Sequence, residues 1–237
     1  MKEHSKRYAE AAKLIEPNKS YNPEEALALI KKMPQTKFDA TVELHLRMGL
    51  DPRNATQQVR GVATLPNGLG KKVRVLVFAQ GEAEKIAQDA GVDAAGADDI
   101  IKKIEEGWLE FDVAIATPDM MGKVSKLGKI LGRKGLMPNP KAGTVVQPAD
   151  LPRVISESRK GRVEFKLDRT GLIHLPIGKT SFDGKKLLGN LAGVIEAIVK
   201  AKPSGAKGQY VETATVAATM GPGVPLDLKT TLALTAE

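Results

Sequence analysis

The chain contains no cysteine, few aromatic residues and no long hydrophobic run. The lack of cysteine excludes disulfides, thiolate metal sites and thiol nucleophiles. Aromatic residues make up only 4% of the 237 residues, which argues against a surface that stacks many bases on rings. No run approaches the roughly 18 apolar residues of a membrane span, and residues 1–12 lack the apolar core of a secretory signal. We therefore expect a cytoplasmic protein with no membrane partner.

Catalytic and metal-binding motifs are also missing from the sequence. The three histidines, His4, His45 and His174, show no metal-ligand spacing, so we predict no metal site. There is no serine elbow and no Gly-Lys-Ser/Thr loop, and residues 77–83 lack the glycines that would let a pyrophosphate approach the backbone. We therefore predict no catalytic residue, no cofactor and no enzymatic activity.

The chain carries an excess of positive charge, with 36 Lys and Arg against 28 Asp and Glu and a net charge of +8. Residues 1–68 and 160–237 together hold 22 bases and 15 acids, whereas residues 69–159 hold 14 and 13. The excess therefore lies in the outer parts of the chain. It favours a polyanionic partner through electrostatic attraction and counterion release.

The outer parts of the chain show the alternation of half-buried strands. Residues 40–50 alternate apolar and polar side chains, and we expect residues 58–65 to be their partner strand. We expect a hairpin around the turn at 168–171. The remaining elements expected here are helices at 23–33 and 185–201 and strands at 210–218 and 224–234.

The middle of the chain follows a different pattern. Residues 73–79 and 111–116 are almost continuously apolar, as in buried parallel strands, and helical patterns alternate with them. These helical patterns cover residues 82–90, 98–106, 121–131 and 149–159. The sequence therefore predicts an α/β protein of two domains. An antiparallel α+β outer domain, residues 1–68 plus 160–237, is interrupted by an inserted three-layer α/β (Rossmann-like) domain, residues 69–159. Two short crossings between domains can act as a hinge.

The most distinctive segment is residues 132–145, with the sequence GRKGLMPNPKAGTV. Its three glycines, two prolines and three cations indicate a shaped basic loop rather than a helix or a central strand. This loop, together with Gly171-Leu172-Ile173-His174 and Thr219-Met220-Gly221-Pro222, closely resembles the bacterial ribosomal protein L-one family, the stalk proteins of the tRNA exit side. The resemblance covers nearly the whole chain and implies the same two-domain arrangement.

The resemblance also implies a function. A member of this family is a structural constituent of the large ribosomal subunit that binds stalk-region ribosomal RNA. It takes part in the release of deacylated tRNA from the exit site and represses translation of its own operon mRNA. The expected partners are these three RNAs, and the expected state of the free protein is a monomer. From the residues alone, a non-specific nucleic-acid chaperone and a nucleotide-dependent enzyme on the inserted domain stay open as alternatives.

The expected RNA-binding residues lie in three segments, at 37–43, 166–174 and 213–221. The family's Thr-Met-Gly triplet and its N-terminal RNA-binding segment imply a role for residues 219–221 and for residues 37–43, and Thr213 and Thr215 share one strand face with Thr219. Few aromatic residues favour recognition by shape, phosphate and 2′-OH contacts. The set is Lys37, Phe38, Thr41, Glu43, Lys166, His174, Thr213, Thr215, Thr219, Met220 and Gly221.

Each of these assignments has a structural alternative. Phe38 fits a core position, and Thr219-Met220-Gly221 fits a simple turn between two strands. In the basic loop, Arg133, Lys134 and Lys141 are candidates for a secondary RNA contact. The alternative for that loop is that it packs against the outer domain.

Overall fold

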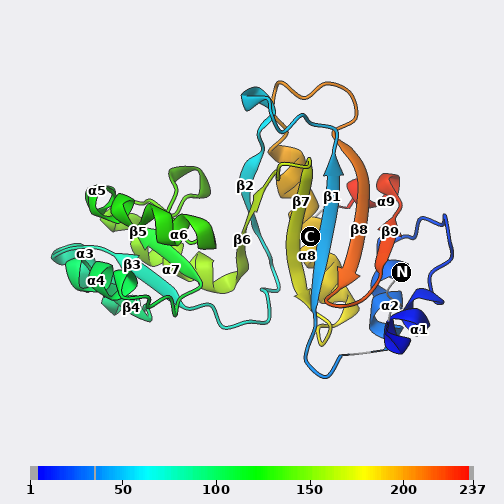
Figure 1. Ribbon diagram of the computed structural model, residues 1–237, viewed down its shortest axis with the longest axis horizontal. Helices are drawn as coiled ribbons and strands as arrows, with labels where there is room; N and C mark the ends of the chain where they lie inside the picture. The colour runs from blue at the N-terminus through cyan, green and yellow to red at the C-terminus, as the bar shows by residue number, and fades with distance from the viewer. Residues whose placement is uncertain (1–4, 35, 235–237) are drawn as a thin grey trace. The chain divides into compact units, whose positions relative to one another are not determined.

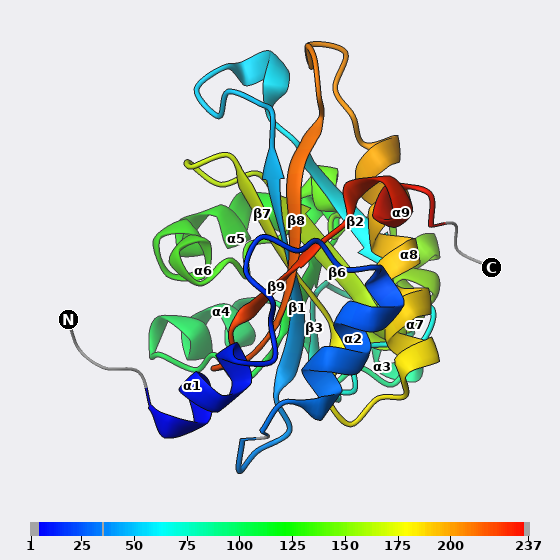
Figure 2. The same cartoon turned by 90° about the vertical axis from the view of Figure 1, so that its right-hand side faces the viewer.

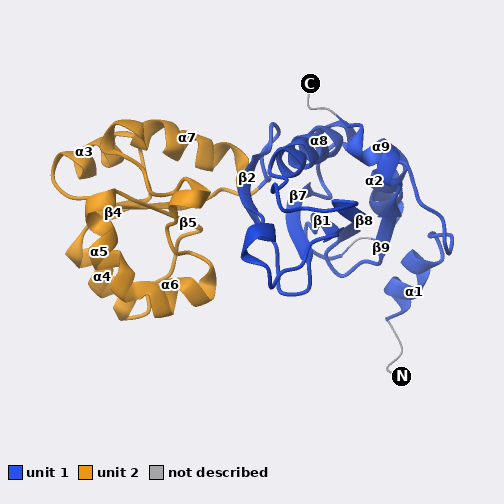
Figure 3. Ribbon diagram, turned by 90° about the horizontal axis from the view of Figure 1, so that it is seen from above, with its two compact units in different colours: residues 1–70, 163–237 blue, residues 71–162 orange. Residues whose placement is uncertain are grey.

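The computed structural model describes residues 5–34 and 36–234 and divides the chain into two units (Figures 1 and 3). Unit 1 comprises residues 1–70 and 163–237, and unit 2 comprises residues 71–162. The predicted crossings at 68/69 and 159/160 therefore lie two and three residues from the changes of unit. The mixed α/β class predicted from the sequence is confirmed.

Unit 1 is built on a four-stranded antiparallel sheet in the order β7-β1-β8-β9. Strand β1 alternates as predicted, with Val42, Leu44 and Leu46 fully buried and the side chains between them on the other face. The strands are β1 (Thr41–Met48), β7 (Leu172–Lys179), β8 (Val211–Ala218) and β9 (Gly223–Leu226).

Helices cover one face of this sheet. Leu187, Leu191 and Ile195 of α8 recur at helical spacing and join the buried strand residues in one core, to which α2 adds Leu27 and Ile30. Helices α2 and α8 lie next to each other on that face (Figure 2). The helices of unit 1 are α1 (Lys6–Ala12), α2 (Pro23–Lys32), α8 (Gly184–Lys200) and α9 (Leu228–Leu232). Within the described residues of unit 1, no helix packs on the opposite face of the sheet.

The structure corrects three sequence predictions in unit 1. Strand β2 (Arg60–Thr64) pairs with β6 (Arg162–Lys166) in a separate two-stranded sheet, so it is not the partner of β1. The predicted hairpin is wrong because β6 and β7 belong to different sheets. The strand expected to run to residue 234 ends at Leu226, because Asp227 caps α9 by accepting from the Thr230 amide.

Strands β2 and β6 approach each other closely at one glycine. A Cβ at Gly61 would lie 2.6 Å from the Phe165 ring, so only glycine lets this ring pack across the ribbon. Alternation of side chains shows which face of a strand is buried but not which strand lies beside it. Which strand pairs with β2 depends on packing between residues far apart in the chain, and a local sequence pattern does not report it.

One buried polar residue ties α8 to the loop where the chain leaves unit 1. Asn190 is 0% exposed. Its Oδ1 accepts from the Asn67 amide at 2.9 Å, and its Nδ2 donates to the Gly68 and Ile177 carbonyls at 2.9 and 2.8 Å. The Asn190 side chain makes all three of these hydrogen bonds to backbone groups. A buried amide needs such partners, because burial removes those that water would supply.

Unit 2 is a three-stranded parallel sheet in the order β4-β3-β5, with helices on both faces. Ala83, Val154 and Ile155 from α3 and α7 pack on one face, and Ile104 and Leu131 from α4 and α6 pack on the other. The elements are β3 (Val75–Phe78), α3 (Glu82–Asp89), β4 (Ala94–Gly96), α4 (Asp98–Glu105), β5 (Val113–Ala116), α5 (Met121–Val124), α6 (Gly128–Lys134) and α7 (Leu151–Gly161).

The sequence missed strand β4, because three residues are too short to show a period. Short 3₁₀ turns add to the connections at Ala55–Gln57, Pro118–Met120, Ser125–Leu127, Pro140–Ala142 and Pro148–Asp150. Within residues 5–34 and 36–234, no helix combines the length and the apolar character needed to cross a bilayer.

Candidate nucleic-acid interface

The open face of the four-stranded sheet brings four of the predicted residues together, namely Glu43, His174, Thr213 and Thr215. His45 of β1 lies opposite His174 of β7 on one side and opposite Thr215 of β8 on the other. Arg47 lies opposite Thr213 in the same way. We call this surface the open face, and define it by Glu43, His45, Arg47, His174, Thr213 and Thr215. It presents hydroxyls, imidazoles and charged groups, all of which can form hydrogen bonds.

Two large apolar side chains stand exposed at one end of the open face. The side chains of Phe38 and Met220 are 54% and 69% exposed, and they flank the residues Thr41 and Thr219 at that end of the sheet. The alternative that Phe38 belongs to the core is therefore wrong. Large apolar side chains exposed to water are typical of a surface that contacts a partner.

The loop that carries Phe38 is anchored by its neighbour. Asp39 accepts hydrogen bonds from the Ser181 amide and hydroxyl at 3.1 and 2.8 Å and from the Thr180 hydroxyl at 3.0 Å. These bonds, the one from the Ser181 hydroxyl foremost, lower the pKa of the Asp39 carboxyl below its usual value. Phe38 is thus presented by a tethered segment, and exposed Lys37 precedes it.

The Thr219 hydroxyl forms hydrogen bonds with the backbone of the adjacent strand. Its Oγ1 accepts from the Thr41 amide at 3.1 Å and donates to the Thr41 carbonyl at 3.2 Å, beside a backbone bond from the Thr219 amide to the same carbonyl. The Thr41 hydroxyl in turn accepts from Lys179 Nζ at 2.9 Å. Thr219 therefore positions this end of the face, and replacing it would also disturb the backbone.

Met220 adopts a left-handed backbone conformation, with φ of +63°. The Gly221 amide donates to the Ala218 carbonyl at 2.8 Å and closes the turn, and the Met220 carbonyl accepts from Arg7 Nη2 at 2.8 Å. The left-handed residue of this turn is therefore Met220 rather than a glycine. Such a conformation costs a non-glycine residue about 1–2 kcal/mol, so a strained and exposed methionine points to a role in binding.

Lys166 is the predicted residue that the structure separates from the open face. It ends β6 in the two-stranded sheet and lines a different hollow, together with Gln58, Asp168 and Arg169. Period-two alternation predicted that Lys166 is exposed, but it could not predict which strand lies beside Lys166. His45 and Arg47, which the sequence analysis did not assign to the site, lie in the middle of the face.

Comparison with known proteins identifies the family. The model of the ribosomal protein L1p/L10e family matches residues 30–222. The large ribosomal subunit protein uL1 of Dehalococcoides mccartyi is 64% identical over 231 residues, covering 98% of both chains. The proteins of the same name from Chloroflexus aggregans and Thermomicrobium roseum are 58% and 55% identical, over 96% and 98% of this chain and 97% of theirs. This chain belongs to the ribosomal protein L1p/L10e family.

Membership in the L1p/L10e family confirms the family resemblance expected from the sequence. Because the relatives are ribosomal proteins, the prediction that the chain is not an enzyme is also confirmed. In the described part of the chain, no group of three or more histidine, aspartate and glutamate side chains could hold a metal ion. His4 lies outside the described residues.

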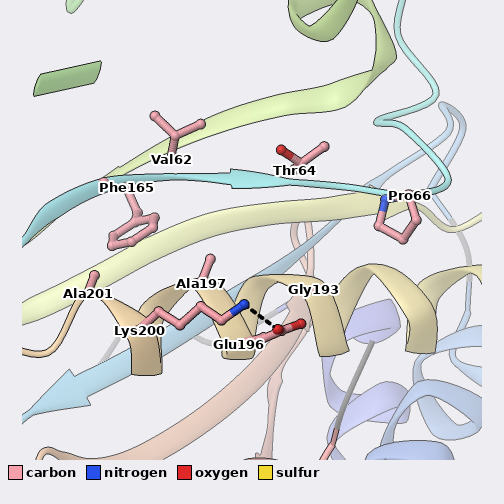
Figure 4. Close-up of a pocket in the computed structure, with 10 residues that line it drawn as sticks. Val62, Thr64, Pro66, Phe165, Gly193, Glu196, Ala197, Lys200 and Ala201 are labelled. Carbon is pink, nitrogen blue, oxygen red and sulfur yellow. Dashed lines mark hydrogen bonds and ion pairs between the residues drawn. The ribbon is translucent and has the colours of Figure 1, made fainter. Parts of the chain in front are cut away.

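Unit 1 also has a groove that contains none of the open-face residues (Figure 4). It has a volume of about 560 Å³ and lies between the β2–β6 ribbon and α8 in unit 1. Its walls are mostly small or apolar, including Gly61, Val62 and Ala197. Its two charged lining residues, Glu196 and Lys200, form an ion pair with each other (Figure 4).

The basic loop at 132–145 is shaped by bonds within unit 2. Gly135 ends α6 in the left-handed conformation, and Val145 bridges to Ala116 of β5. Arg162 Nη2 donates to the Ala142 carbonyl at 2.6 Å. Arg133, Lys134 and Lys141 are all exposed on this segment. The glycines and prolines that make the segment so recognisable thus serve its own fold, while the three cations face solvent.

Proposed function

We propose that the open face, with Phe38 and Met220 at its end, binds stalk-region ribosomal RNA and makes the chain a constituent of the large ribosomal subunit in the cytoplasm. The observation that carries this proposal is the pair of exposed apolar side chains, held by a tethered loop and a strained turn beside hydrogen-bonding groups. The names of its relatives, large ribosomal subunit protein uL1, agree with it.

The chemistry of the face suits folded RNA. Thr213 and Thr215 can donate to and accept from 2′-hydroxyls, and Lys37 can contact a phosphate. Phe38 supplies one flat ring for a base or a ribose, and Met220 a polarizable contact beside it. One ring with polar neighbours is suited to recognising the shape of a folded RNA. It is not suited to stacking on many successive bases.

The same face serves the two finer roles that the family suggests. In repression, the operon mRNA would occupy the open face when free protein exceeds ribosomal RNA, which requires the ribosomal RNA to bind more tightly. In tRNA release, the two chain crossings near residues 70 and 163 would let one unit move while the other stays on the stalk. Arg133, Lys134 and Lys141 would add a secondary contact to RNA phosphates.

A salt-titrated binding assay tests the main proposal. A stalk-region ribosomal RNA fragment and an unrelated duplex of equal length are compared with the wild type, Lys37→Ala and the control Lys186→Ala. Lys186 is an exposed lysine on α8. We expect selective binding of the fragment, and a salt slope that Lys37→Ala reduces by about 1. Equal affinity for both RNAs would instead favour the non-specific chaperone.

Replacing Met220 with glycine separates fold from function. Glycine adopts the left-handed conformation freely, so Met220→Gly is expected to leave the free energy of unfolding unchanged or to raise it by about 1 kcal/mol. The exposed side chain is lost, and the affinity for the stalk fragment is expected to fall about tenfold. Calorimetry and the binding assay measure the two effects.

Asn18→Gly is the matched control, because exposed Asn18 also has a φ of +63°. We expect it to keep full RNA affinity. A Met220→Gly protein that binds RNA as tightly as the wild type would show that the strained methionine has no role in recognition.

A further inference from the structure

The N-terminal helix α1 reaches both segments that carry the exposed apolar side chains. Arg7 Nη2 donates to the Met220 carbonyl at 2.8 Å, and Arg7 Nη1 donates to the Pro34 carbonyl at 3.3 Å. Arg7 and Met220 are 213 positions apart in the chain. One guanidinium therefore joins the β8–β9 turn to the segment that leads to Phe38. We call these two hydrogen bonds the Arg7 bridge.

The bond to Pro34 bears on Phe38 through a short stretch of chain. Thr36 Oγ1 donates to the Phe38 carbonyl at 2.6 Å. Beyond Phe38, the Asp39 carboxylate accepts hydrogen bonds from the loop that follows β7. The Phe38 segment is thus held on both sides. Asp39 fixes the end nearer the sheet, and the Arg7 bridge fixes the end nearer α2.

The space between α1, the Pro34 segment and the β8–β9 turn is almost filled. The cavity that they enclose has a volume of about 10 Å³, and its walls include Arg7, Ala11, Pro34 and Gly221. Such a volume holds at most about one water molecule. Figures 1 and 2 both place α1 at the end of the sheet where β1 begins and β8 ends. Because the side chains pack closely here, a shift of α1 is transmitted to the turn.

Helix α1 depends on the rest of the protein for its stability. It has seven residues, and isolated helices shorter than about 12–15 residues are marginal in water. Ser5 caps its N-terminus by accepting from the Tyr8 amide at 3.4 Å. Ala11 is 2% exposed and belongs to the core of unit 1. Ala11 and the Arg7 bridge therefore both help to hold α1 on the sheet.

The Arg7 bridge acts on a strained turn. Met220 has a φ of +63°, and a non-glycine residue keeps such a conformation only where surrounding contacts hold it. The bond from Arg7 to the Met220 carbonyl orients the peptide group that follows Met220. The Met220 side chain is 69% exposed, so its direction is set by this backbone rather than by packing around it.

We infer that Arg7 is a positioning residue for RNA recognition, which fixes the Met220 turn relative to the Phe38 segment. The inference rests on the proposed function and adds α1 to the recognition surface. The terminal nitrogens of Arg7 are directed at two carbonyls of the protein, so Arg7 acts through Met220 and Phe38 rather than on a phosphate. A planar guanidinium offers two N–H groups at a fixed spacing, whereas a lysine ammonium is a point charge on a flexible stem.

Binding of the stalk-region RNA fragment by the full chain is the first test. We expect Arg7→Ala to lower the affinity about tenfold and to leave the salt slope unchanged, because no phosphate contact is lost. Arg7→Lys keeps the charge but cannot reproduce both bonds, so it should lose about threefold or more. Lys13→Ala is the matched control, because it removes an exposed cation next to α1, and it should bind like the wild type.

Two results of this assay would overturn the positioning role. The first is an Arg7→Lys protein that binds like the wild type, because charge alone would then be sufficient. The second is an Arg7→Ala protein whose salt slope falls by about 1, as expected when a phosphate contact is removed. Thermal unfolding of the same samples shows whether each variant is folded. Arg7→Lys, which keeps the aliphatic stem, keeps the test decisive if Arg7→Ala does not fold.

A double-mutant cycle separates positioning from a general disturbance of the fold. Met220→Gly already removes the side chain that Arg7 positions. Adding Arg7→Ala to Met220→Gly should therefore lower the affinity by less than about threefold, compared with about tenfold in the wild-type background. Equal factors in the two backgrounds would show that Arg7 does not act through Met220.

The methyl resonance of Met220 in the free protein tests the Arg7 bridge without RNA. We expect this resonance to shift in Arg7→Ala, because the turn loses one of its bonds, and to stay in place in Lys13→Ala. An unshifted resonance in Arg7→Ala would overturn the inference. Failure of the wild type to bind the fragment selectively would instead refute the proposed function, and the methyl resonance would still decide whether Arg7 holds the turn.

Discussion

Replacing Phe38 with alanine is expected to lower the affinity for the stalk-region RNA fragment by about 5- to 150-fold, since a ring that stacks on a base contributes roughly 1–3 kcal/mol. The Phe38 side chain is 54% exposed, so its removal creates no cavity and the free energy of unfolding should change by less than about 0.5 kcal/mol. A large loss of affinity at unchanged stability is the signature of a contact residue. Equilibrium binding and thermal unfolding of the same samples measure both quantities.

The matched control for Phe38→Ala is Val199→Ala. Val199 is an apolar residue of α8 in the same unit, and its side chain is 46% exposed. Helix α8 packs on the covered face of the sheet, so this variant should bind RNA like the wild type. If both variants lose the same affinity, or if Phe38→Ala also unfolds at a lower temperature, the loss reflects a disturbed fold rather than a lost contact.

Replacing Asn190 with alanine is expected to lower the free energy of unfolding of unit 1 by about 3 kcal/mol. The change leaves three backbone groups, the Asn67 amide and the Gly68 and Ile177 carbonyls, without the partners that they have now. Each buried group that loses its hydrogen bond costs about 1–3 kcal/mol, and those nearer the surface recover part of this from water.

The distribution of aromatic residues allows each unit to be followed separately. All three tyrosines, Tyr8, Tyr21 and Tyr210, belong to unit 1, and the single tryptophan, Trp108, belongs to unit 2. In a denaturant titration, Asn190→Ala should shift the tyrosine transition to lower denaturant while the tryptophan transition stays in place. Lys186→Ala, on the same helix but exposed, should shift neither. A variant with an unshifted tyrosine transition would show that Asn190 is not needed for the stability of unit 1.

The sequence predicted the parts of the fold that local patterns control. Alternation in β1 depends only on which side chains meet the core, and the apolar runs of β3 and β5 follow from burial on both faces. Pairing was different: β2 joins β6, and the Phe165 ring lies over Gly61. That contact joins residues that are far apart in the chain, so no local pattern contains it.

The same distinction holds for the candidate site. Period-two spacing placed Thr213 and Thr215 on one face, and the family resemblance implied Phe38, Met220 and their neighbours. The resemblance could not show that Phe38 is exposed, that Thr219 is tied to the Thr41 backbone, or that Met220 has a left-handed backbone. Those properties depend on contacts with other strands.

By itself, the sequence determined that thiol chemistry is excluded and that positive charge is in excess. It also determined the alternating and continuous apolar patterns and the motifs of a ribosomal protein family. These are properties of single residues and of their near neighbours along the chain. Only the tertiary structure decided that His45 and His174 meet at 2.8 Å, because their contact depends on the register between β1 and β7. Register is a long-range property, set by the packing of a whole sheet against its helices.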